Sequence, residues 1–345
     1  MEKAKVLLIY TGGTIGMIED PETGTLKAFD FNHLEDHIPE LARIDVDLTT
    51  LSMNPPIDSS DMNPTIWKEL TELIYQHYAD YHGFVILHGS DTMAYSASAM
   101  SFMLQGITKP IIFTGSQLPI GKIRTDGKEN LITAIEIAAT LNKNGESIIQ
   151  EVAIYFEYTL YRANRTTKVS AHAFEAFQSP NYPELAKAGV SIKYDYAALY
   201  RNEGKKLALS TKMDHRIALL KIFPGFSPKV YKDLFDVTTV KAIVLETFGA
   251  GNAPNDAAFH AMIGTYIQSG GVVINVTQCF SGAVDQGKYA NSTMFNELGV
   301  ISGKSMTTEA AITKTMYLLG KGTSPADFVT AIHNDCAGEM DGDLY

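Results

Sequence analysis

The chain has 345 residues, of which 45% are hydrophobic and 19% charged, and its formal net charge is −11 at pH 7. At this length two domains are expected, in an ordinary globular protein. The acidic balance argues against a nucleic-acid-binding surface, and no apolar segment approaches the roughly 18 residues that a membrane-spanning helix needs.

The N-terminus does not have the pattern of a secretory signal. Lys3 and Lys5 precede an apolar run that two glycines soon end, whereas a signal peptide carries a longer apolar region and a cleavage site. Cys279 and Cys336 are the only cysteines, which agrees with a reducing compartment. We therefore expect a cytoplasmic protein.

Short, nearly continuous apolar runs recur along the chain, as is typical of strands buried on both faces of a parallel sheet. They span residues 6–10, 84–87, 111–114, 152–156, 217–222, 242–245 and 272–276. Segments of helical period lie between them, such as the stripe of Ile66, Leu70, Leu73 and Ile74 after Asn63-Pro64. Another stripe follows Asp126, formed by Leu131, Ile132, Ile135 and Ala138. This alternation predicts an α/β fold with two doubly wound domains and mostly parallel sheets.

The alternating pattern lapses between about residues 178 and 215, where Pro180, Pro183 and the charged segment RNEGKK occur. We place the domain boundary there. The prediction is a larger N-terminal catalytic domain over residues 1–190, a linker over 191–213, and a smaller C-terminal domain over 214–345.

Two loops that follow predicted strands carry hydroxyl groups beside glycines. The first is TGGTIG, residues 11–16, and the second is HGSDT, residues 88–92. In an open α/β sheet, ligands bind beyond the carboxyl ends of the strands. TGGTIG is not the dinucleotide fingerprint, because Thr14 stands where that motif needs glycine. Thr14 is either a turn or cap residue or, since Gly12, Gly13 and Gly16 allow close approach, a nucleophile that needs activation.

The HGSDT loop offers a hydroxyl and a carboxylate side by side. Ser90 and Asp91 form a triad-like group if Lys168, which follows a later strand, reaches them. Asp91 could instead open the helix that continues to Met100. The Asp91 charge would raise the pKa of Lys168, whereas burial would lower it, so the role of Lys168 as a base stays open. His88 is a conceivable base, but a histidine satisfied by nearby backbone is the favoured interpretation.

A third polar loop, DSSDM over residues 58–62, adds carboxylates and hydroxyls before a predicted helix. A carboxylate can accept from an ammonium group, while serines and backbone N–H groups can hold a carboxylate. Together the three loops suit a zwitterionic amino acid. No motif specifies a metal or an organic cofactor, since His33 and His37 lack both the zincin glutamate and a third ligand.

With these motifs the sequence resembles the bacterial-type L-asparaginases, and within them the cytoplasmic type I enzymes. TGGTIG and HGSDTMAYSASAM carry the resemblance, and further segments support it, namely TGSQLP, LYRANRTTK, FGAGNAP and NVTQCFSG. The resemblance implies a larger N-terminal and a smaller C-terminal domain, and homodimers that pair into tetramers. It also implies hydrolysis of L-asparagine to L-aspartate and ammonia, with weaker glutaminase activity.

The family pattern also assigns roles to residues of this chain. Thr14 is the nucleophile of a covalent acyl-enzyme, assisted by Ser90, Asp91 and Lys168. The substrate-binding set comprises Asp58, Ser59, Ser60, Ser90, Asp91, Ser116 and Asn252. Backbone amides near Ser90 and Ser116 are candidates for stabilising the oxyanion, and Asn252 is expected to reach the site of a neighbouring subunit.

The chain departs from the family pattern at three places. Ser90 stands where threonine is usual, which keeps the hydroxyl but loses a methyl group that restricts its rotamer. Thr25 falls where the family has a mobile-loop tyrosine, so that partner of Thr14 stays unassigned. Some type I enzymes have a second, allosteric asparagine site, matched here by Thr167, Thr277 and Cys279. Glu246 replaces an arginine of that site, which reverses its interaction with a carboxylate, so we expect weak or absent allosteric activation.

Two other functions compete with the hydrolase. A tRNA-linked amidotransferase subunit would use the same fold, but the N-terminus at the first strand and the acidic charge argue against RNA docking. A non-catalytic amino-acid sensor would use the same pocket, and Thr14→Ala should leave its ligand binding intact.

Overall fold

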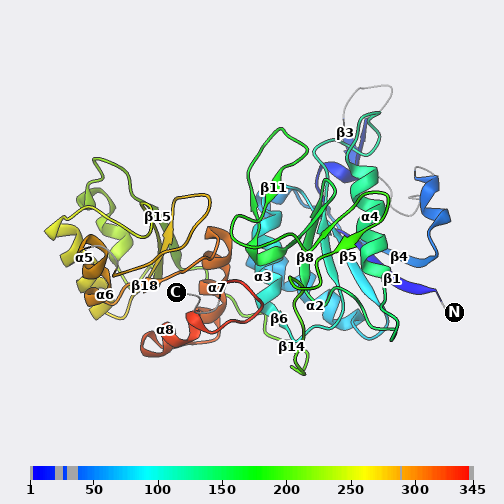
Figure 1. Ribbon diagram of the computed structural model, residues 1–345. Helices are drawn as coiled ribbons and strands as arrows, with labels where there is room; N and C mark the ends of the chain where they lie inside the picture. The colour runs from blue at the N-terminus through cyan, green and yellow to red at the C-terminus, as the bar shows by residue number, and fades with distance from the viewer. Residues whose placement is uncertain (1–2, 20–25, 29–37, 288–289, 342–345) are drawn as a thin grey trace. The chain divides into compact units, whose positions relative to one another are not determined.

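The computed structural model describes the chain except for residues 1–2, 20–25, 29–37, 288–289 and 342–345 (Figure 1). Internal contacts divide it into two compact units, Met1–Thr211 and Lys212–Tyr345. Each unit contains a mainly parallel sheet with helices, as the sequence predicts. Among the described residues, no helix combines the length and apolarity needed to cross a membrane.

The first unit is built on an eight-stranded sheet with the order β13-β12-β9-β8-β7-β5-β1-β4. In chain order its strands are β1 (Ala4–Tyr10), β4 (Val46–Ser52), β5 (Gly83–Leu87), β7 (Ile111–Thr114), β8 (Val152–Phe156), β9 (Thr159–Arg162), β12 (Ala186–Lys187) and β13 (Lys193–Tyr194). Strands β4, β1, β5, β7 and β8 are parallel neighbours, and β9 turns back antiparallel to β8. The loops after β4, β1, β5 and β7 therefore leave the sheet at one edge.

Alternate side chains of the central strands pack into two separate cores. On one side Val6 and Leu8 of β1 pack with Leu131 and Ile135 of α4 (Gly127–Ala139). On the other side the core contains residues of β1, β5, α2 (Pro64–His77) and α3 (Met93–Met103), among them Leu7, Ile9, Leu70 and Ala97. Strands buried on both faces cannot show polar alternation, which explains the continuous apolar runs of the sequence.

Short elements complete the first unit. They are β2 (Met17–Glu19) with β3 (Leu26–Ala28), β6 (Leu104–Gln105) with β14 (Ala208–Leu209), β10 (Thr167–Lys168) with β11 (Phe177–Gln178), and the 3₁₀ helices η1 (Thr14–Gly16), η3 (Pro39–Arg43), η4 (Ser59–Asp61) and η5 (Ala163–Arg165). Much of the expected linker 191–213 packs here: Tyr194 pairs with Ala186, and Ala198 and Leu199 are buried.

The second unit has a four-stranded parallel sheet, ordered β15-β16-β17-β18. Its elements are β15 (Ile217–Lys221), η6 (Pro228–Phe235), β16 (Ala242–Thr247), α5 (Ala257–Gln268), β17 (Val272–Thr277), α6 (Ala290–Leu298), β18 (Ile301–Ser302), α7 (Thr308–Gly320) and α8 (Pro325–His333). Aromatic residues of η6 and α5, including Phe235, Phe259 and Tyr266, pack with strand residues in its core.

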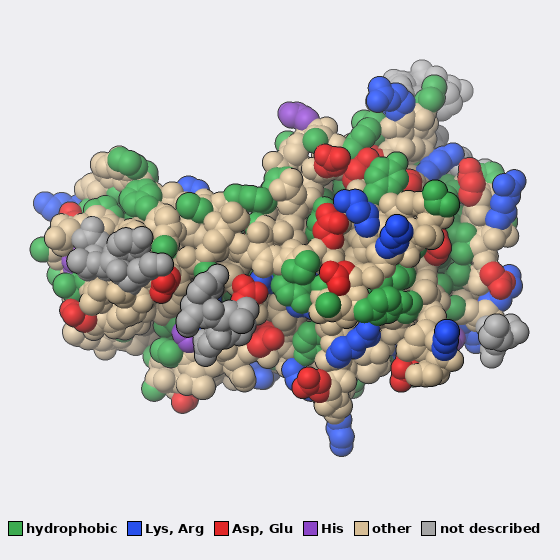
Figure 2. Space-filling model, in the orientation of Figure 1, with side chains coloured by type: hydrophobic (Ala, Val, Ile, Leu, Met, Phe, Trp, Pro, Cys, Tyr) green, Lys and Arg blue, Asp and Glu red, His purple; other side chains and the backbone are tan. Residues whose placement is uncertain are grey.

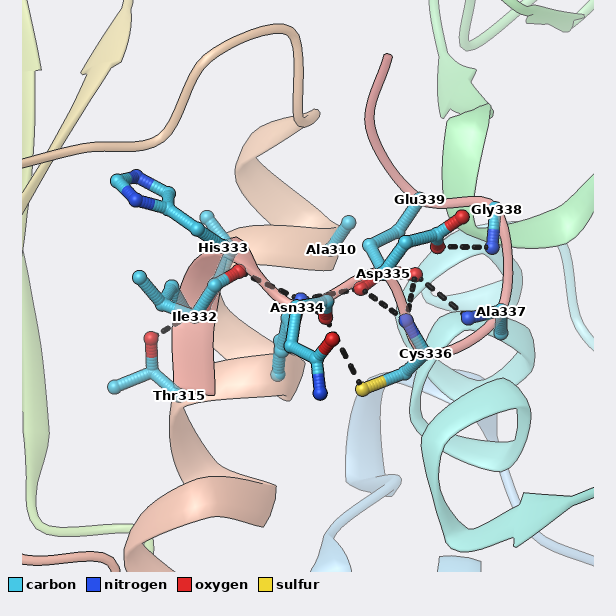
Figure 3. Close-up of polar contacts among 12 residues, drawn as sticks. Ala310, Thr315, Ile332, His333, Asn334, Asp335, Cys336, Ala337, Gly338 and Glu339 are labelled. Carbon is cyan, nitrogen blue, oxygen red and sulfur yellow. Dashed lines mark hydrogen bonds and ion pairs between the residues drawn. The ribbon is translucent and has the colours of Figure 1, made fainter. Parts of the chain in front are cut away.

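A buried ion pair joins α7 to the segment that follows α8. The Lys314 ammonium donates to the carbonyl oxygens of Ile332 and Asn334, at 2.7 and 2.8 Å, and to the carboxylate of Glu339. Both charged side chains are fully buried. Figure 3 shows the turn around Glu339, whose carboxylate also accepts from the backbone N–H groups of Cys336 and Ala337. The C-terminal segment is therefore held in the unit by charge as well as by packing.

Candidate active site

Three loops at the carboxyl edge of the first sheet meet through their main chains. A Cβ atom added at Gly12 would lie 2.0 Å from the carbonyl oxygen of Ile57, and one at Gly13 would lie 2.6 Å from the Cα atom of Gly89. One added at Gly89 would lie 2.5 Å from the Oγ atom of Ser59. Gly12 and Gly13 also have φ angles of 137° and 90°, which side-chain-bearing residues rarely adopt. Glycine is thus required for the loops to touch.

Hydrogen bonds hold these loops in register. The backbone N–H of Thr11 donates to the carbonyl of Leu87 at 3.0 Å, and the N–H of Ile57 donates to the carbonyl of Thr11 at 2.8 Å. The Thr92 hydroxyl donates to the carbonyl of Ser59 at 2.6 Å. The TGGTIG, DSSDM and HGSDT segments therefore form one surface.

Thr14 begins the 3₁₀ helix η1 and is half-buried. Within the described part of the chain, its hydroxyl has no hydrogen-bond partner. The ring of Tyr10 packs directly against the loop, because a Cβ atom added at Gly16 would lie 2.2 Å from a ring carbon of Tyr10. The Tyr10 hydroxyl also donates to the carbonyl of Gly16 at 3.3 Å. Burial raises the pKa of Tyr10 to about 12, so it stays a neutral phenol.

The structure brings Ser90, Asp91 and Lys168 together. The Lys168 ammonium, on β10, lies 2.9 Å from the Ser90 Oγ atom and 2.6 Å from the Asp91 Oδ1 atom. The Asp91 side chain is 69% exposed and that of Lys168 is 16% exposed. Asp91 does not open the following helix, contrary to one interpretation of the sequence, because α3 begins at Met93 with Thr92 as its N-cap. The Asp91 carboxylate is paired with Lys168 instead.

Ser90 is already engaged on both sides of its hydroxyl group. Its oxygen accepts from Lys168, and its O–H donates to the Oε1 atom of Gln117 at 3.3 Å. The Gln117 amide in turn donates to the carbonyl of Ala173 at 2.9 Å. Gln117 lies in the TGSQLP segment, but a glutamine in a loop does not by itself indicate that its side chain binds Ser90.

Asp126 shapes the loop that follows β7. Its carboxylate accepts from the backbone N–H groups of Gln117 and Leu118, at 2.9 and 3.1 Å. Burial raises the Asp126 pKa, and these amide hydrogen bonds oppose the rise. The buried Ser116 hydroxyl donates to the carbonyl of Leu118 at 2.6 Å. Asp126 thus positions the loop, although the sequence suggested only that it precedes a helix.

The 58–60 segment presents its polar groups in one 3₁₀ turn. The Asp58 carboxylate accepts from the backbone N–H and from the hydroxyl of Ser60, both at 2.8 Å, which holds the pKa of Asp58 below its usual value. Ser59 is buried, whereas Asp58 and Ser60 are exposed. An ionised carboxylate next to a hydroxyl can receive the ammonium group of an amino acid.

His88 is fully buried, with both ring nitrogens hydrogen-bonded. Nδ1 lies 2.7 Å from the carbonyl oxygen of Gly89, and Nε2 lies 2.8 Å from the hydroxyl of Ser96. Burial lowers the His88 pKa to about 4. The favoured interpretation of the sequence, a histidine satisfied by its surroundings, agrees with this geometry.

The remaining predicted site residues divide between the two units. Thr167 lies on β10 of the first unit, paired with Gln178. In the second unit the backbone of Asn252 forms an isolated β-bridge with that of Phe248. The buried Oδ1 atom of Asn252 has no hydrogen-bond partner among the described residues.

Three of the proposed allosteric residues also lie in the second unit. Glu246 pairs with Lys221 at 3.1 Å and accepts from the hydroxyl of Thr308 at 2.7 Å. Thr277 donates to the carbonyl of Gly249 at 2.6 Å and accepts from the N–H of the exposed Cys279. The negative charge of the Glu246 carboxylate is thus compensated by residues of its own unit.

No cluster of three or more metal-ligating side chains occurs in the part of the chain that the structure describes. Thr25, His33 and His37 lie outside the described residues.

Comparison with known proteins agrees with the fold and with the family that the sequence resembles. The asparaginase N-terminal family model matches residues 5–200, and the glutaminase/asparaginase C-terminal domain model matches residues 216–331. The chain is 41% identical to L-asparaginase 1 of Escherichia coli (strain K12) over 99% of its own length and 100% of that protein. The structure of L-asparaginase I from Vibrio cholerae is 36% identical, with a TM-score of 0.89, and covers 99% of this chain and 100% of that one.

A relative with a different name also matches most of the chain. It is a glutamyl-tRNA(Gln) amidotransferase subunit of Thermococcus kodakarensis, which is 31% identical over 97% of this chain and 76% of that protein. Two matched domain models in the expected order, together with a full-length relative, establish the family. The chain belongs to the asparaginase family of amide-hydrolysing enzymes.

Proposed function

We propose that this protein hydrolyses L-asparagine to L-aspartate and ammonia through a covalent acyl-threonine intermediate on Thr14. One observation carries the proposal: the Thr14 loop touches the HGSDT loop at Gly13 and Gly89, while Lys168 binds Ser90 and Asp91 of that loop. A nucleophile, a charged proton-handling group and an amino-acid-binding turn are thereby gathered at one edge of the sheet.

The hydrogen bonds favour Thr14 over Ser90 as the nucleophile. Ser90 accepts from a cationic lysine, which lowers the electron density on its oxygen, and its proton is directed to Gln117. In the first step the Thr14 oxygen forms an ester with the substrate carbonyl carbon, and the C–N bond breaks. The nitrogen leaves as ammonia with the proton that Thr14 gave up. In the second step water cleaves the ester, releasing aspartate and restoring the Thr14 hydroxyl.

Lys168 and its partners serve proton transfer in this scheme. In the structure the Lys168 Nζ atom donates to both Ser90 and Asp91, so it can take up the Thr14 proton only after passing one on. Gln117 and Ser90 form a continuous path of hydrogen bonds from this lysine. We assign Ser90, Asp91 and Lys168 to relaying the proton rather than to attacking the substrate.

The substrate would be oriented by the turn at residues 58–60. Asp58 and Ser60 are exposed and adjacent, which suits an α-ammonium group, and Ser59 and Ser90 offer hydroxyls. A glutamine side chain is one methylene longer, and such a difference changes binding by only about 1–3 kcal/mol. We therefore expect weaker glutaminase activity beside asparaginase activity.

Rapid quenching tests the intermediate. The wild-type protein is mixed with asparagine, quenched in acid, digested and examined by mass spectrometry for an aspartyl group on Thr14. Thr14→Ala should lose ammonia release and the adduct, while Ser90→Ala should keep the adduct at a reduced rate. Ammonia release that survives in Thr14→Ala would contradict the assignment, and no release from either amide by the wild type would contradict the hydrolase.

The similarity to an amidotransferase subunit favours a second candidate, in which the amide nitrogen is passed on to a charged tRNA. Lys, Arg, Asp and Glu side chains are interspersed on the face that Figure 2 shows, over the first unit, without a basic stripe for a phosphate backbone. Ammonia release from free asparagine without tRNA supports the hydrolase. Release that requires tRNA would support the transferase.

We further propose a cytoplasmic homodimer, or a pair of such dimers, as the working form. The family resemblance supports a contact of Asn252 with a neighbouring subunit, and the free thiols of Cys279 and Cys336 suit a reducing compartment. Light scattering after size exclusion measures the oligomer, and a monomer with full activity would exclude a shared site.

A further inference from the structure

A chain of hydrogen bonds beneath the proposed active site defines the protonation state of His88. The Trp67 indole N–H lies 2.9 Å from the Ser96 oxygen, the Ser96 oxygen lies 2.8 Å from His88 Nε2, and His88 Nδ1 lies 2.7 Å from the Gly89 carbonyl. An indole N–H only donates and a carbonyl only accepts. Nδ1 must therefore carry a proton to bind the Gly89 carbonyl, and in the neutral ring Nε2 accepts the proton of Ser96.

The surroundings keep His88 neutral as well as oriented. The ring is fully buried and packs against Phe113 with 5.8 Å between ring centroids, and its two nitrogens meet a carbonyl and a hydroxyl rather than a carboxylate. A charged imidazolium would be buried here without a carboxylate to compensate its charge, which disfavours it. One tautomer, with a proton on Nδ1, is thereby selected.

This tautomer holds the peptide between Gly89 and Ser90 in one orientation. In a trans peptide the C=O and N–H groups point in opposite directions. With the Gly89 carbonyl held at His88, the Ser90 N–H must point away from the His88 ring. Within the described residues nothing accepts a hydrogen bond from this N–H. Rotation of the peptide is inexpensive at glycine, so the loop alone would not prevent the carbonyl from taking the place of the N–H.

We propose that His88 is a positioning residue, which holds the Gly89 carbonyl so that the Ser90 N–H is presented to the negatively charged oxygen that develops on the substrate. This inference rests on the hydrolase proposed above. The role differs from a catalytic base, because His88 reaches the reaction only through the peptide that it orients. Ser96 supports the same tautomer, because its hydroxyl donates to the unprotonated Nε2 atom while its oxygen accepts from Trp67.

Two substitutions of similar size separate this role from simple packing. In His88→Asn the amide NH₂ takes the place of Nδ1 and can still donate to the Gly89 carbonyl, while contact with Ser96 is lost. In His88→Gln the amide takes the place of Nε2, so that contact with Ser96 is kept and the donor to Gly89 is lost. Both remove the ring, so packing alone predicts similar effects.

We expect His88→Gln to lower kcat on asparagine about 10- to 100-fold with KM nearly unchanged, because an oxyanion donor acts in the transition state. His88→Asn keeps a donor to the Gly89 carbonyl, so its kcat should stay within about threefold of the wild-type value. Equal losses in both variants, or a loss confined to KM, would overturn the proposal. Wild-type protein without any turnover would overturn the hydrolase and this inference together.

A spectroscopic measurement reads the tautomer directly, without a histidine variant that must fold. Nitrogen-15 NMR of protein labelled at histidine should show His88 protonated at Nδ1 in the wild type. In Ser96→Ala the Gly89 carbonyl still requires a donor at Nδ1, so the tautomer should be kept and kcat should stay within about threefold of the wild type. A wild-type His88 protonated at Nε2, or a Ser96→Ala variant that keeps the tautomer but loses kcat as strongly as His88→Gln, would refute the role.

Discussion

At the scale of single residues, the site depends on which oxygen atoms are left available. Lys168 and Gln117 occupy the hydroxyl of Ser90, whereas the Thr14 hydroxyl has no partner within the described residues. The sequence could suggest both as candidates, because each is a hydroxyl on a glycine-containing loop. It could not rank them, since Lys168 is 78 residues from Ser90 in sequence and nothing in the TGSQLP segment indicates that Gln117 binds Ser90.

The hydroxyl at position 90 should be more important than the shape of the residue that carries it. Ser90→Thr keeps the acceptor for Lys168 and adds a methyl group that restricts rotation, so we expect kcat within about threefold of the wild type. Ser90→Ala removes the relay and should lower kcat by about 100-fold or more. Steady-state ammonia release measures both, and equal activities of the two variants would contradict the relay.

The buried imidazole of His88 should also make stability depend on pH. Its native pKa is about 4, below the ordinary value of 6.5, so between these values the unfolded chain binds the extra proton. The free energy of unfolding therefore falls as the pH drops through this window, by at most about 1.4 kcal/mol per pH unit. Urea unfolding at pH 7.5 and pH 5 should show a drop larger in the wild type than in His88→Asn by about 2 kcal/mol. Equal drops would mean that His88 titrates normally.

At the scale of elements, the loop contacts explain why three separate motifs act together. Gly13 has a φ angle of 90° and no room for a Cβ atom beside Gly89. Gly145 has a similar φ angle of 80°, yet nothing lies within 4 Å of the position that its Cβ would take. The two glycines share backbone strain and differ in crowding, which makes them a matched pair.

Gly13→Ala should therefore abolish asparagine hydrolysis, because the Thr14 loop must move away from the HGSDT loop. Gly145→Ala should cost about 1–3 kcal/mol of stability for the strained φ angle and leave kcat intact. Activity assays and urea unfolding on the two variants distinguish these effects. Retained activity in Gly13→Ala would show that the contact between the loops is dispensable.

The elements themselves could largely be predicted from the sequence, because buried parallel strands produce continuous apolar runs. The predicted strands 111–114 and 152–156 have the observed bounds. The supporting residues could not be predicted. Asp126 precedes α4 as a cap residue would, yet its carboxylate binds the amides of Gln117 and Leu118. Whether the Asp126 carboxylate caps α4 or binds the loop amides depends on how the loop after β7 packs against the start of α4.

At the scale of the whole molecule, we expect stability to depend on charges buried in the second unit. Lys314 and Glu339 are buried together and share their hydrogen bonds with backbone groups. Removing one partner leaves an uncompensated charge, so Glu339→Gln should destabilise the protein by about 3–5 kcal/mol. The double variant Lys314→Met/Glu339→Leu should recover much of that loss. Thermal and urea unfolding measure both, and a double variant as unstable as the single one would argue against charge as the cause.

The proposed allosteric activation should be weak or absent. By the resemblance, Glu246 stands where some type I enzymes have an arginine, and its carboxylate is paired with Lys221. Initial rates over a wide range of asparagine concentrations should therefore follow a hyperbola. A sigmoidal curve that becomes hyperbolic on changing Thr167 or Cys279 would show that the second site works despite the replacement.

In the three loops, the residues that align the backbone of the site differ from the residues whose side chains would contact the substrate. Gly12 and Gly13 let the loops meet main chain to main chain, and Gly89 leaves room for the Ser59 side chain. Ser60 on one of these loops and Gln117 on the loop after β7 contribute further polar side chains. Substitutions of such side chains can thus change the preference for one small polar amide over another, while the backbone that aligns the reacting groups stays unchanged. An inherited catalytic geometry and an adaptable substrate range can coexist in one fold for this reason.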